Sequence, residues 1–198
     1  MISRILPVLF IALQVLPAGV AHAEKADADK DMDIVCDHWD DNDVKQIRTC
    51  TGNVIMKQGT LIMKGAKLVV TESPDGWNSA VLYAPPSGLA TMRQKRDGGP
   101  DLWMEGEASD RITYDQKTGV ASMYVKAKTR RLTGLVKTDE ATGPFLTYNS
   151  QTEIVTGAMS PSGEAVGNEG DRPHVVIQPH HSPTGAPAQS SAPDTKGK

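Results

Sequence analysis

The chain has 198 residues and a formal net charge of −3. A length of this order fits one domain with a hydrophobic core, together with terminal tails. The slightly acidic balance does not favour nucleic-acid binding, which is normally marked by a basic excess or a basic stripe. We therefore expect no nucleic-acid partner.

Residues 1–23 have the pattern of a cleaved secretory signal. Arg4 supplies a basic start, residues 5–20 are mainly apolar, and Ala-His-Ala at 21–23 matches the small-x-small cleavage motif. A membrane anchor is the alternative, but the apolar stretch is shorter than the roughly 20 residues that span a bilayer. The pattern predicts export, and the charged, small residues at 24–31 predict a flexible lead-in.

Cys36 and Cys50 are the only cysteines of the chain. In an oxidising compartment an even pair is most simply a disulfide, and the turn-forming run at 40–43 would let the two face each other across a hairpin. A bridge closing a loop of about 15 residues would stabilise the fold by roughly 3 kcal/mol. A redox-active pair would need a CxxC-like arrangement, which this spacing does not supply.

From Met32 onward, apolar and polar residues alternate over short runs that are separated by turn signals, as is typical of β-strands. No window has the apolar stripe of an amphipathic helix. Regular short strands predict an all-β sandwich, barrel or jelly roll. We predict strands over 32–38, 44–50, 52–58, 60–72, 77–84, 88–95, 101–115, 119–128, 131–139, 144–149, 153–159 and 173–178.

Two segments share one pattern. ITYDQKTGVAS at 112–122 aligns with LTYNSQTEIVT at 146–156, which places Tyr114 over Tyr148, and 68–81 is a looser copy. Each copy reads as a strand, a polar turn and a returning strand, so the fold is predicted to stack repeated hairpin units. Residues 180–198, rich in Pro, Ser, Ala and Gly, predict a disordered tail.

Catalytic and metal-binding patterns are sparse, and we expect neither a cofactor nor a metal site. Glu105 and Glu107 share one strand face, but a glycosidase needs an opposing carboxylate at a set distance, so a solvated face is favoured. The acidic run at 37–43 lacks the central Gly and terminal Glu of a calcium loop. An isolated His180–His181 pair is a weak metal site.

A basic cluster occurs near the middle of the chain. Its members at even positions would share one strand face and form a positive strip. Such a strip could hold phosphates or sugar acids, or it could protect an exposed sheet edge from aggregation, and the edge interpretation is favoured. The cluster consists of Lys126, Lys128, Arg130 and Arg131.

Apolar residues at alternate positions of successive strands would line one interior. The chain has eight methionines and only 5% aromatic residues. Methionine is flexible and suits a surface that accommodates variable apolar chains, but it also fills ordinary cores. The predicted interior residues are Met32, Ile34, Met56, Leu61, Met63, Leu68, Val70, Met92, Ile112, Tyr114, Leu146 and Tyr148.

A longer motif then identifies a family. TGNVIMKQGTLIMKGAKLVVT at 51–71, with IVCD at 34–37 and GEASDRITYD at 106–115, resembles the OstA-like domain of periplasmic lipopolysaccharide-transport proteins. The resemblance extends from about residue 32 to 178. Two features depart from the family pattern, namely the cysteine pair and a longer region at 126–143.

The resemblance implies an open, V-shaped β-jelly roll over 32–179 and a non-enzymatic role. Its interior would hold the acyl chains of lipopolysaccharide while the sugars stay in water, so that the residues of the predicted interior would bind lipid. In the family, protomers stack head to tail through edge strands and link LptC at the inner membrane to LptD and LptE at the outer membrane.

Three alternatives stay open at this point. A membrane-tethered, LptC-like component of the same pathway would retain its N-terminal anchor. A secreted sugar-processing enzyme on a jelly-roll scaffold would need Glu105 and Glu107 in a cleft with a partner. A purely structural envelope protein would not bind lipid at all.

Overall fold

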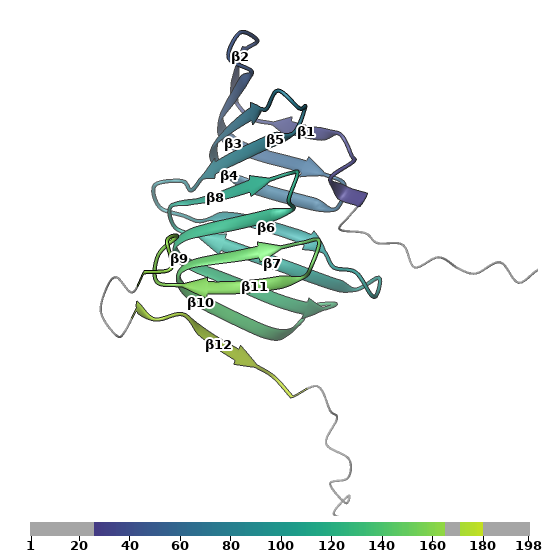
Figure 1. Ribbon diagram of the computed structural model, residues 1–198, viewed down its shortest axis with the longest axis vertical. Helices are drawn as coiled ribbons and strands as arrows, with labels where there is room; N and C mark the ends of the chain where they lie inside the picture. Colours follow the sequence, from purple (N-terminus) through teal and green to yellow (C-terminus); the bar gives the residue numbers. More distant parts are fainter. Residues whose placement is uncertain (1–25, 165–170, 180–198) are drawn as a thin grey trace, which may run out of the picture.

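The computed structural model describes residues 26–164 and 171–179, and their regular structure is almost entirely antiparallel β-sheet (Figure 1). The predicted signal at 1–23 and the predicted tail at 180–198, with His180 and His181, lie outside the described residues. The strands are β1 (Met32–Val35), β2 (His38–Asn42), β3 (Ile47–Gln58), β4 (Leu61–Glu72), β5 (Asn78–Tyr83), β6 (Ala90–Lys95), β7 (Leu102–Ala108), β8 (Arg111–Asp115), β9 (Val120–Thr133), β10 (Val136–Asn149), β11 (Ile154–Ala158) and β12 (His174–Ile177).

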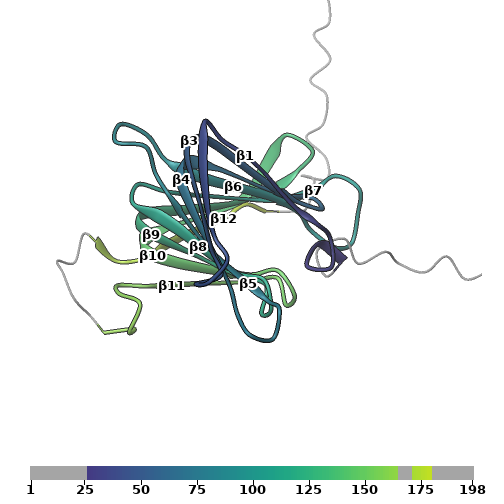
Figure 2. The ribbon, with the colours of Figure 1, turned by 90° about the horizontal axis from the view of Figure 1, so that it is seen from above.

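Four long strands, β3, β4, β9 and β10, each contribute to two layers of the fold. Layer A has the strand order β1-β3-β4-β6-β7-β9-β10-β12 and uses residues 54–58, 61–65, 127–133 and 136–143 of the long strands. Layer B has the order β2-β3-β4-β5-β8-β9-β10-β11 and uses residues 47–51, 67–72, 120–124 and 145–149. Figure 2 shows the two layers as a V, seen along its length.

The long strands bend where they pass from one layer to the other. In β3 the register shifts between Thr51 and Val54, and Gly52 and Asn53 have φ angles of 78° and 47°. A Cβ on Gly52 would lie 2.3 Å from Asp37 Oδ2, and the Asn53 side chain donates to the same oxygen at 2.9 Å. Gly and Asn tolerate this left-handed backbone better than other residues. The Thr-Gly-Asn motif is therefore the bulge that turns β3 between layers.

The bends define two sides of the V. The long strands, the β5–β6 connection and the β7–β8 connection join the layers on one side, which we call the closed side. On the other side, the open side, the hairpin turns of the two layers are separate. The β3–β4, β6–β7 and β9–β10 turns belong to layer A, and the β4–β5, β8–β9 and β10–β11 turns belong to layer B.

Several predicted strand boundaries are wrong. The predicted strands 44–50 and 52–58 form the single strand β3, because its bulge keeps the hydrogen-bond ladder going. The predicted strand 32–38 divides into β1 and β2, and 101–115 divides into β7 and β8. At both divisions the chain keeps its direction but passes from layer A to layer B, opposite the bends of β3 and β9, and local alternation does not record this crossing.

The predicted strands 119–128, 131–139 and 144–149 are also wrong, because the structure has only β9 and β10 in this region. Val125 and Lys126 adopt φ angles of 65° and 48°, so the chain bends there without ending the strand. The actual hairpin turn lies at Gly134, whose φ is 62°.

The internal repeat corresponds to equivalent hairpins of layer B. In the β8–β9 turn, Asp115 Oδ1 accepts hydrogen bonds from the Thr118 backbone N–H and hydroxyl, both at 2.8 Å. In the β10–β11 turn, Asn149 Oδ1 accepts from the Thr152 N–H at 3.0 Å. This shared hydrogen bond, from the backbone N–H of a threonine to the Asp or Asn side chain three residues before it, explains why these polar positions recur in the two copies.

Within the predicted lead-in at 24–31, of which the structure describes residues 26–31, Asp27 packs into the fold. Asp27 is only 3% exposed, and its carboxylate accepts hydrogen bonds from Thr60 and Gln94. Composition indicates flexibility only when the charged groups have no partners in the fold, and Asp27 has partners from distant strands.

Cys36 and Cys50 form a disulfide with Cα atoms 5.9 Å apart. Cys36 lies between β1 and β2, where the chain crosses from layer A to layer B, and Cys50 lies in the layer B half of β3. The hairpin turn of β2 and β3 follows Asn42 instead of occupying the predicted 40–43. The bridge therefore ties the crossover of the N-terminal edge strands to the body of the sheet.

Replacing both cysteines with serine should lower the free energy of unfolding by about 2–4 kcal/mol, because the unfolded chain loses its constraint. Urea denaturation of the oxidised protein and of the double variant measures the difference. Reductant should lower the midpoint of the wild-type protein to that of the variant and leave the variant unchanged. Equal midpoints for the oxidised wild type and the variant would contradict this prediction.

Candidate functional site

Cross-strand partners form continuous rows along the inner face of each layer. The layer A row is Ile34, Met56, Met63, Met92, Gly106, Thr129, Ala141 and Val175. One layer B row is Cys50, Leu68, Leu82, Ile112, Met123, Leu146 and Gly157, and a second is Val70, Ala80, Tyr114, Ala121, Tyr148 and Val155. These rows run from the N-terminal strands to the C-terminal strands without a polar break other than Thr129.

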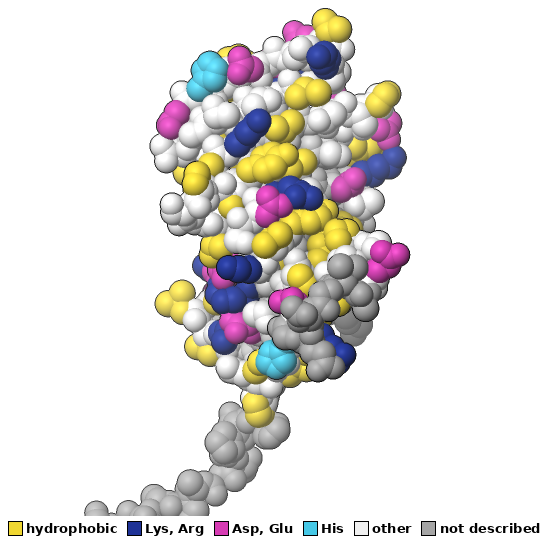
Figure 3. Space-filling view, turned by 90° about the vertical axis from the view of Figure 1, so that its left-hand side faces the viewer, with side chains coloured by type: hydrophobic (Ala, Val, Ile, Leu, Met, Phe, Trp, Pro, Cys, Tyr) yellow, Lys and Arg dark blue, Asp and Glu magenta, His cyan; other side chains and the backbone are white. Residues whose placement is uncertain are grey.

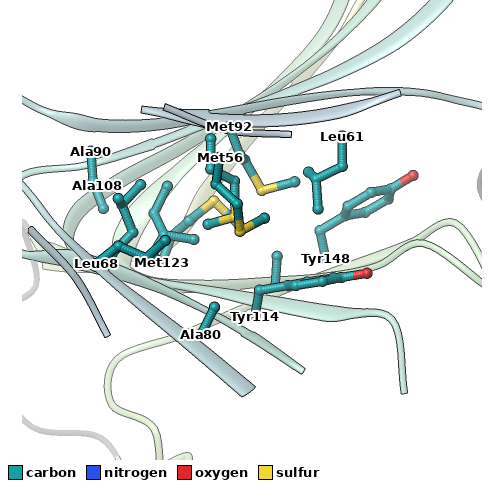
Figure 4. Packing of buried hydrophobic residues seen from close by; sticks show 14 of the residues in the cluster. Met56, Leu61, Leu68, Ala80, Ala90, Met92, Ala108, Tyr114, Met123 and Tyr148 are labelled. Carbon is teal, nitrogen blue, oxygen red and sulfur yellow. The ribbon is translucent and has the colours of Figure 1, made fainter. Parts of the chain in front are cut away.

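The two layers meet at Gly106. A Cβ there would lie 2.7 Å from the Sδ atom of Met123 in layer B and 2.8 Å from the Cγ atom of Met92 in layer A. Figure 4 shows methionine side chains gathered between the layers, with smaller alanines on the surrounding strands. Gly106 leaves the volume that these long side chains occupy, so the middle of the interior is filled by flexible thioethers.

The structure brings all twelve predicted interior residues into contact with one cluster. Met32 and Ile34 are half-buried against it. The ten buried members are Met56, Leu61, Met63, Leu68, Val70, Met92, Ile112, Tyr114, Leu146 and Tyr148, each at most 3% exposed. Whether these residues contact a lipid stays a prediction.

Several interior residues were missed by the sequence reasoning. Leu82, Met104 and Met123 are completely buried in the same cluster. Each lies two residues from Ala80, Gly106 or Ala121 on the same strand, which is the spacing of a buried strand face. Because these neighbours are small, the apolar alternation in the sequence is weak. Asp27 left no pattern at all, because a single buried carboxylate has no periodicity.

Each end of the interior opens into a cleft. The N-terminal end cleft has a volume of about 450 Å³ and the C-terminal end cleft about 470 Å³. Ile34, Leu68 and Val70 of the inner rows line the first, and Leu146 and Val155 line the second. The interior rows therefore end in accessible apolar walls at both ends of the roll.

Tyr114 and Tyr148 lie on either side of Ala121 in one layer B row, and Figure 4 shows their hydroxyl groups pointing to the same side, away from the methionines. Burial, together with the negative charges of Asp27 and Asp115, raises the pKa of Tyr114 to about 12. The phenol is therefore held in its neutral form where the interior meets the open side.

The two singled-out carboxylates, Glu105 and Glu107, lie on the outer face of layer A. Glu105 accepts a hydrogen bond from Arg93 at 2.9 Å. Glu107 accepts from Arg130 at 3.1 Å and lies 3.3 Å from the Lys128 ammonium. Each carboxylate is thus engaged by cations from neighbouring strands instead of opposing another carboxylate.

The predicted edge role of the basic cluster is wrong. β9 lies inside the sheet between β7 and β10, so it is not an edge strand. Lys126 occupies the bend of β9 and Arg131 lines the C-terminal end cleft, which leaves only Lys128 and Arg130 on the outer face. Arg130 also pairs with Glu140 of β10 at 3.1 Å. These cations join three strands and do not form a free positive strip.

The closed side carries hydrophobic side chains on its outer surface. Figure 3 shows them as a band flanked by charged residues. Leu89 and Val125, which belong to the β5–β6 connection and the β9 bend, are 40% and 50% exposed. Beside the bend, the Tyr124 ring packs against Phe145 with centroids 5.1 Å apart.

Two searches were negative over the described residues. No group of three or more His, Cys, Asp or Glu side chains there is placed to hold a metal ion. Among residues 26–164 and 171–179, no helix has the length and apolar character needed to cross a membrane.

Replacing Tyr114 with phenylalanine should make the stability of the fold less sensitive to alkaline pH. The folded-state pKa lies above the ordinary value of 10.0, so the contribution of the neutral phenol is complete below pH 10 and is lost as the pH rises towards 12. The wild-type protein should therefore lose more unfolding free energy than Tyr114→Phe between pH 10 and 12. Parallel urea curves below and within this window measure it, and identical losses would refute the assignment.

Comparison with known proteins agrees with this architecture. Residues 33–154 match the family described as "LptA/(LptD N-terminal domain) LPS transport protein". The chain is 25% identical over 142 residues to the lipopolysaccharide export system protein LptA of Haemophilus influenzae, covering 72% of this chain and 78% of that protein. The crystal structure of LptH from Pseudomonas aeruginosa, an LptA-homologous periplasmic component of the lipopolysaccharide transport device, aligns with a TM-score of 0.66 at 18% identity, covering 77% and 99% of the two chains.

The structural match confirms the predicted open, V-shaped β-jelly roll. The family match covers more than half of the chain and includes the Thr-Gly-Asn bulge, β4 and the Tyr114 hairpin. This chain therefore belongs to the LptA/LptD N-terminal domain family of lipopolysaccharide-transport proteins.

Proposed function

We propose that this protein is a periplasmic carrier that moves lipopolysaccharide from the inner to the outer membrane, with the acyl chains held between its two layers. The observation that carries the proposal is the continuous apolar interior, which ends in an apolar cleft at each end of the roll. Membership of a lipopolysaccharide-transport family indicates that the ligand is lipopolysaccharide. The role is non-enzymatic.

The interior is chemically suited to acyl chains. Burial of hydrocarbon gains about 0.8 kcal/mol per CH₂, so partial insertion of a few chains supports binding. Met56, Met63, Met92 and Met123 fill the space in the absence of lipid. Because unbranched thioether side chains change rotamer at low cost, they can yield volume to an incoming chain without disrupting the sheet. This accounts for methionine at positions where a rigid core favours Val, Ile or Phe.

The ends of the roll are suited to head-to-tail assembly. Among the residues that the structure describes, β1 and β2 at one end, and β11 and β12 at the other, each pair with a single neighbour and so keep an unpaired edge. Val175 and Ile177 of β12 are 61% and 70% exposed. Edges of this kind add strands from a partner, and a heterologous contact repeats as a filament. In our proposal copies of this chain stack in this way, with LptC at the inner-membrane end and LptD with LptE at the outer-membrane end.

A photo-crosslinking amino acid at position 63 should capture lipopolysaccharide in cells, whereas the same amino acid at position 64 should not. Met63 points into the interior and is 0% exposed, and Lys64 is its exposed neighbour on the same strand. Immunoblots for lipopolysaccharide adducts, with comparable protein levels, measure the difference. The two positions form a matched pair because they share strand, register and expression context.

Position 114, also in the interior, extends this experiment to layer B. If neither Met63 nor Tyr114 gave an adduct in a folded protein, the carrier function would be refuted and a closed structural roll would take its place. The N-terminal sequence of the mature protein is a separate check. Cleavage before Glu24 fits a free periplasmic carrier, and an intact N-terminus fits a tethered component.

A further inference from the structure

A short N-terminal segment lies across the open side of the V. This segment, residues 26–30, which we call the strap, precedes β1 (Figure 2). Polar residues of both layers surround it, and they come from the hairpin turns and strand ends that form the two lips of the open side.

Asp27 pins the strap to layer A. Its carboxylate accepts from the Thr60 backbone N–H at 2.7 Å, from the Thr60 hydroxyl at 2.6 Å and from the Gln94 amide at 2.9 Å. A Cβ on Gly59, whose φ is 57°, would lie only 2.0 Å from Asp27 Oδ1. The β3–β4 turn is therefore shaped around this carboxylate, which is 3% exposed.

The next residues of the strap reach layer B. The Gln116 side chain, at the end of β8, donates to the Ala28 carbonyl at 2.7 Å, and its own carbonyl oxygen is held by Asn78. Gln58 of layer A donates to the Lys30 carbonyl at 3.0 Å. The strap thus links the two lips through hydrogen bonds, which water can replace.

A second polar contact closes the open side towards the C-terminal strands. Glu153 of the β10–β11 turn accepts from Arg96 at 2.5 Å and from the Asp97 backbone N–H at 2.9 Å, both in the β6–β7 loop of layer A. Arg131 of layer A donates to the Glu153 carbonyl at 3.0 Å. Like the strap, this contact joins lips that no covalent turn connects.

The closed lips leave buried polar atoms without partners. Among the described residues, Gln58 Oε1, Asn78 Oδ1, Arg96 Nε and Arg131 Nε are buried and form no hydrogen bond. Gln58, Arg96 and Arg131 make the contacts between strap and lip or between the lips, and Asn78 holds Gln116, which contacts the strap. If the lips separated, water would form hydrogen bonds with these atoms. Opening would therefore recover part of the free energy that their burial costs.

We propose that the strap is a displaceable gate, pinned by Asp27, and that acyl chains enter and leave the interior sideways through the open side when it is released. The proposal rests on the proposed carrier function. Passage along the interior from one end would require Met92 and Met123, which pack around Gly106, to change rotamer on the way. Sideways entry keeps the polar sugars in water while only the chains pass the lips.

Asp27→Ala is the releasing variant and Asp29→Ala is its matched control, because Asp29 is an exposed carboxylate of the same segment. With lipopolysaccharide fluorescently labelled on its sugars, the rise of label anisotropy measures the rate of loading. Loss of the hydrogen bonds to a buried charge should speed loading about tenfold in Asp27→Ala and leave Asp29→Ala at the wild-type rate. Gln116→Ala, which cuts the contact to layer B, should change the rate in the same direction. Near-ultraviolet circular dichroism checks that each variant is folded.

A locked variant tests the opposite direction. Asp27→Cys combined with Thr60→Cys replaces side chains that are in hydrogen-bond contact, so oxidation ties the strap to layer A. The oxidised double variant should not load, and reductant should restore loading. Wild-type protein given the same reductant controls for the Cys36–Cys50 bridge.

The outcomes separate the gate from the carrier function. Loading of the locked protein at the wild-type rate, or equal rates for Asp27→Ala and Asp29→Ala, would overturn the gate while leaving the carrier function intact. Failure of the wild-type and every folded variant to load would overturn both. Fast loading of Asp27→Ala together with blocked loading of the locked protein is the result we expect.

Discussion

The fold depends on one covalent constraint, namely that β3, β4, β9 and β10 each belong to both layers. Because every long strand bends on the same side, the layers cannot separate there, and the hairpin turns collect on the opposite side. The sheet thus encloses its apolar face by folding onto itself, which removes that face from water without a second domain. The closed side, the open side and the two end clefts all follow from these shared strands.

The chemistry of the interior follows from how close the layers come. At Gly106 the absence of a Cβ admits two methionine side chains from opposite layers. This packing fills the space between the layers, yet it consists of side chains whose rotamers change easily. An interior of branched residues would hold the same volume more rigidly, and lipid could enter it only by straining the backbone. Methionine packing therefore stabilises the fold and also allows the interior to take up a ligand.

Polar groups are divided between two places with different consequences. On the outer face of layer A, Glu107 and Arg130 join neighbouring strands in water, where ion pairs contribute little individually but keep the surface charged and mixed. On the open side, the buried Asp27 contacts the lip of layer A and the partly exposed Glu153 joins the two lips. The same residue types therefore support the sheet in one place and hold a reversible closure in the other.

The sequence by itself determined the all-β class, the family, the disulfide and the interior rows, because strand alternation, a specific bulge motif and a single cysteine pair are local signals. Leu68 and Met63 were both placed inside by their apolar character. Only the tertiary structure decided where long strands bend, since a positive-φ bulge at Val125 and a true turn at Gly134 resemble each other in the sequence. It also decided that Asp27 is a buried pin and that β9 is not an edge, because the partners that define both come from strands distant along the chain, and no local pattern records them.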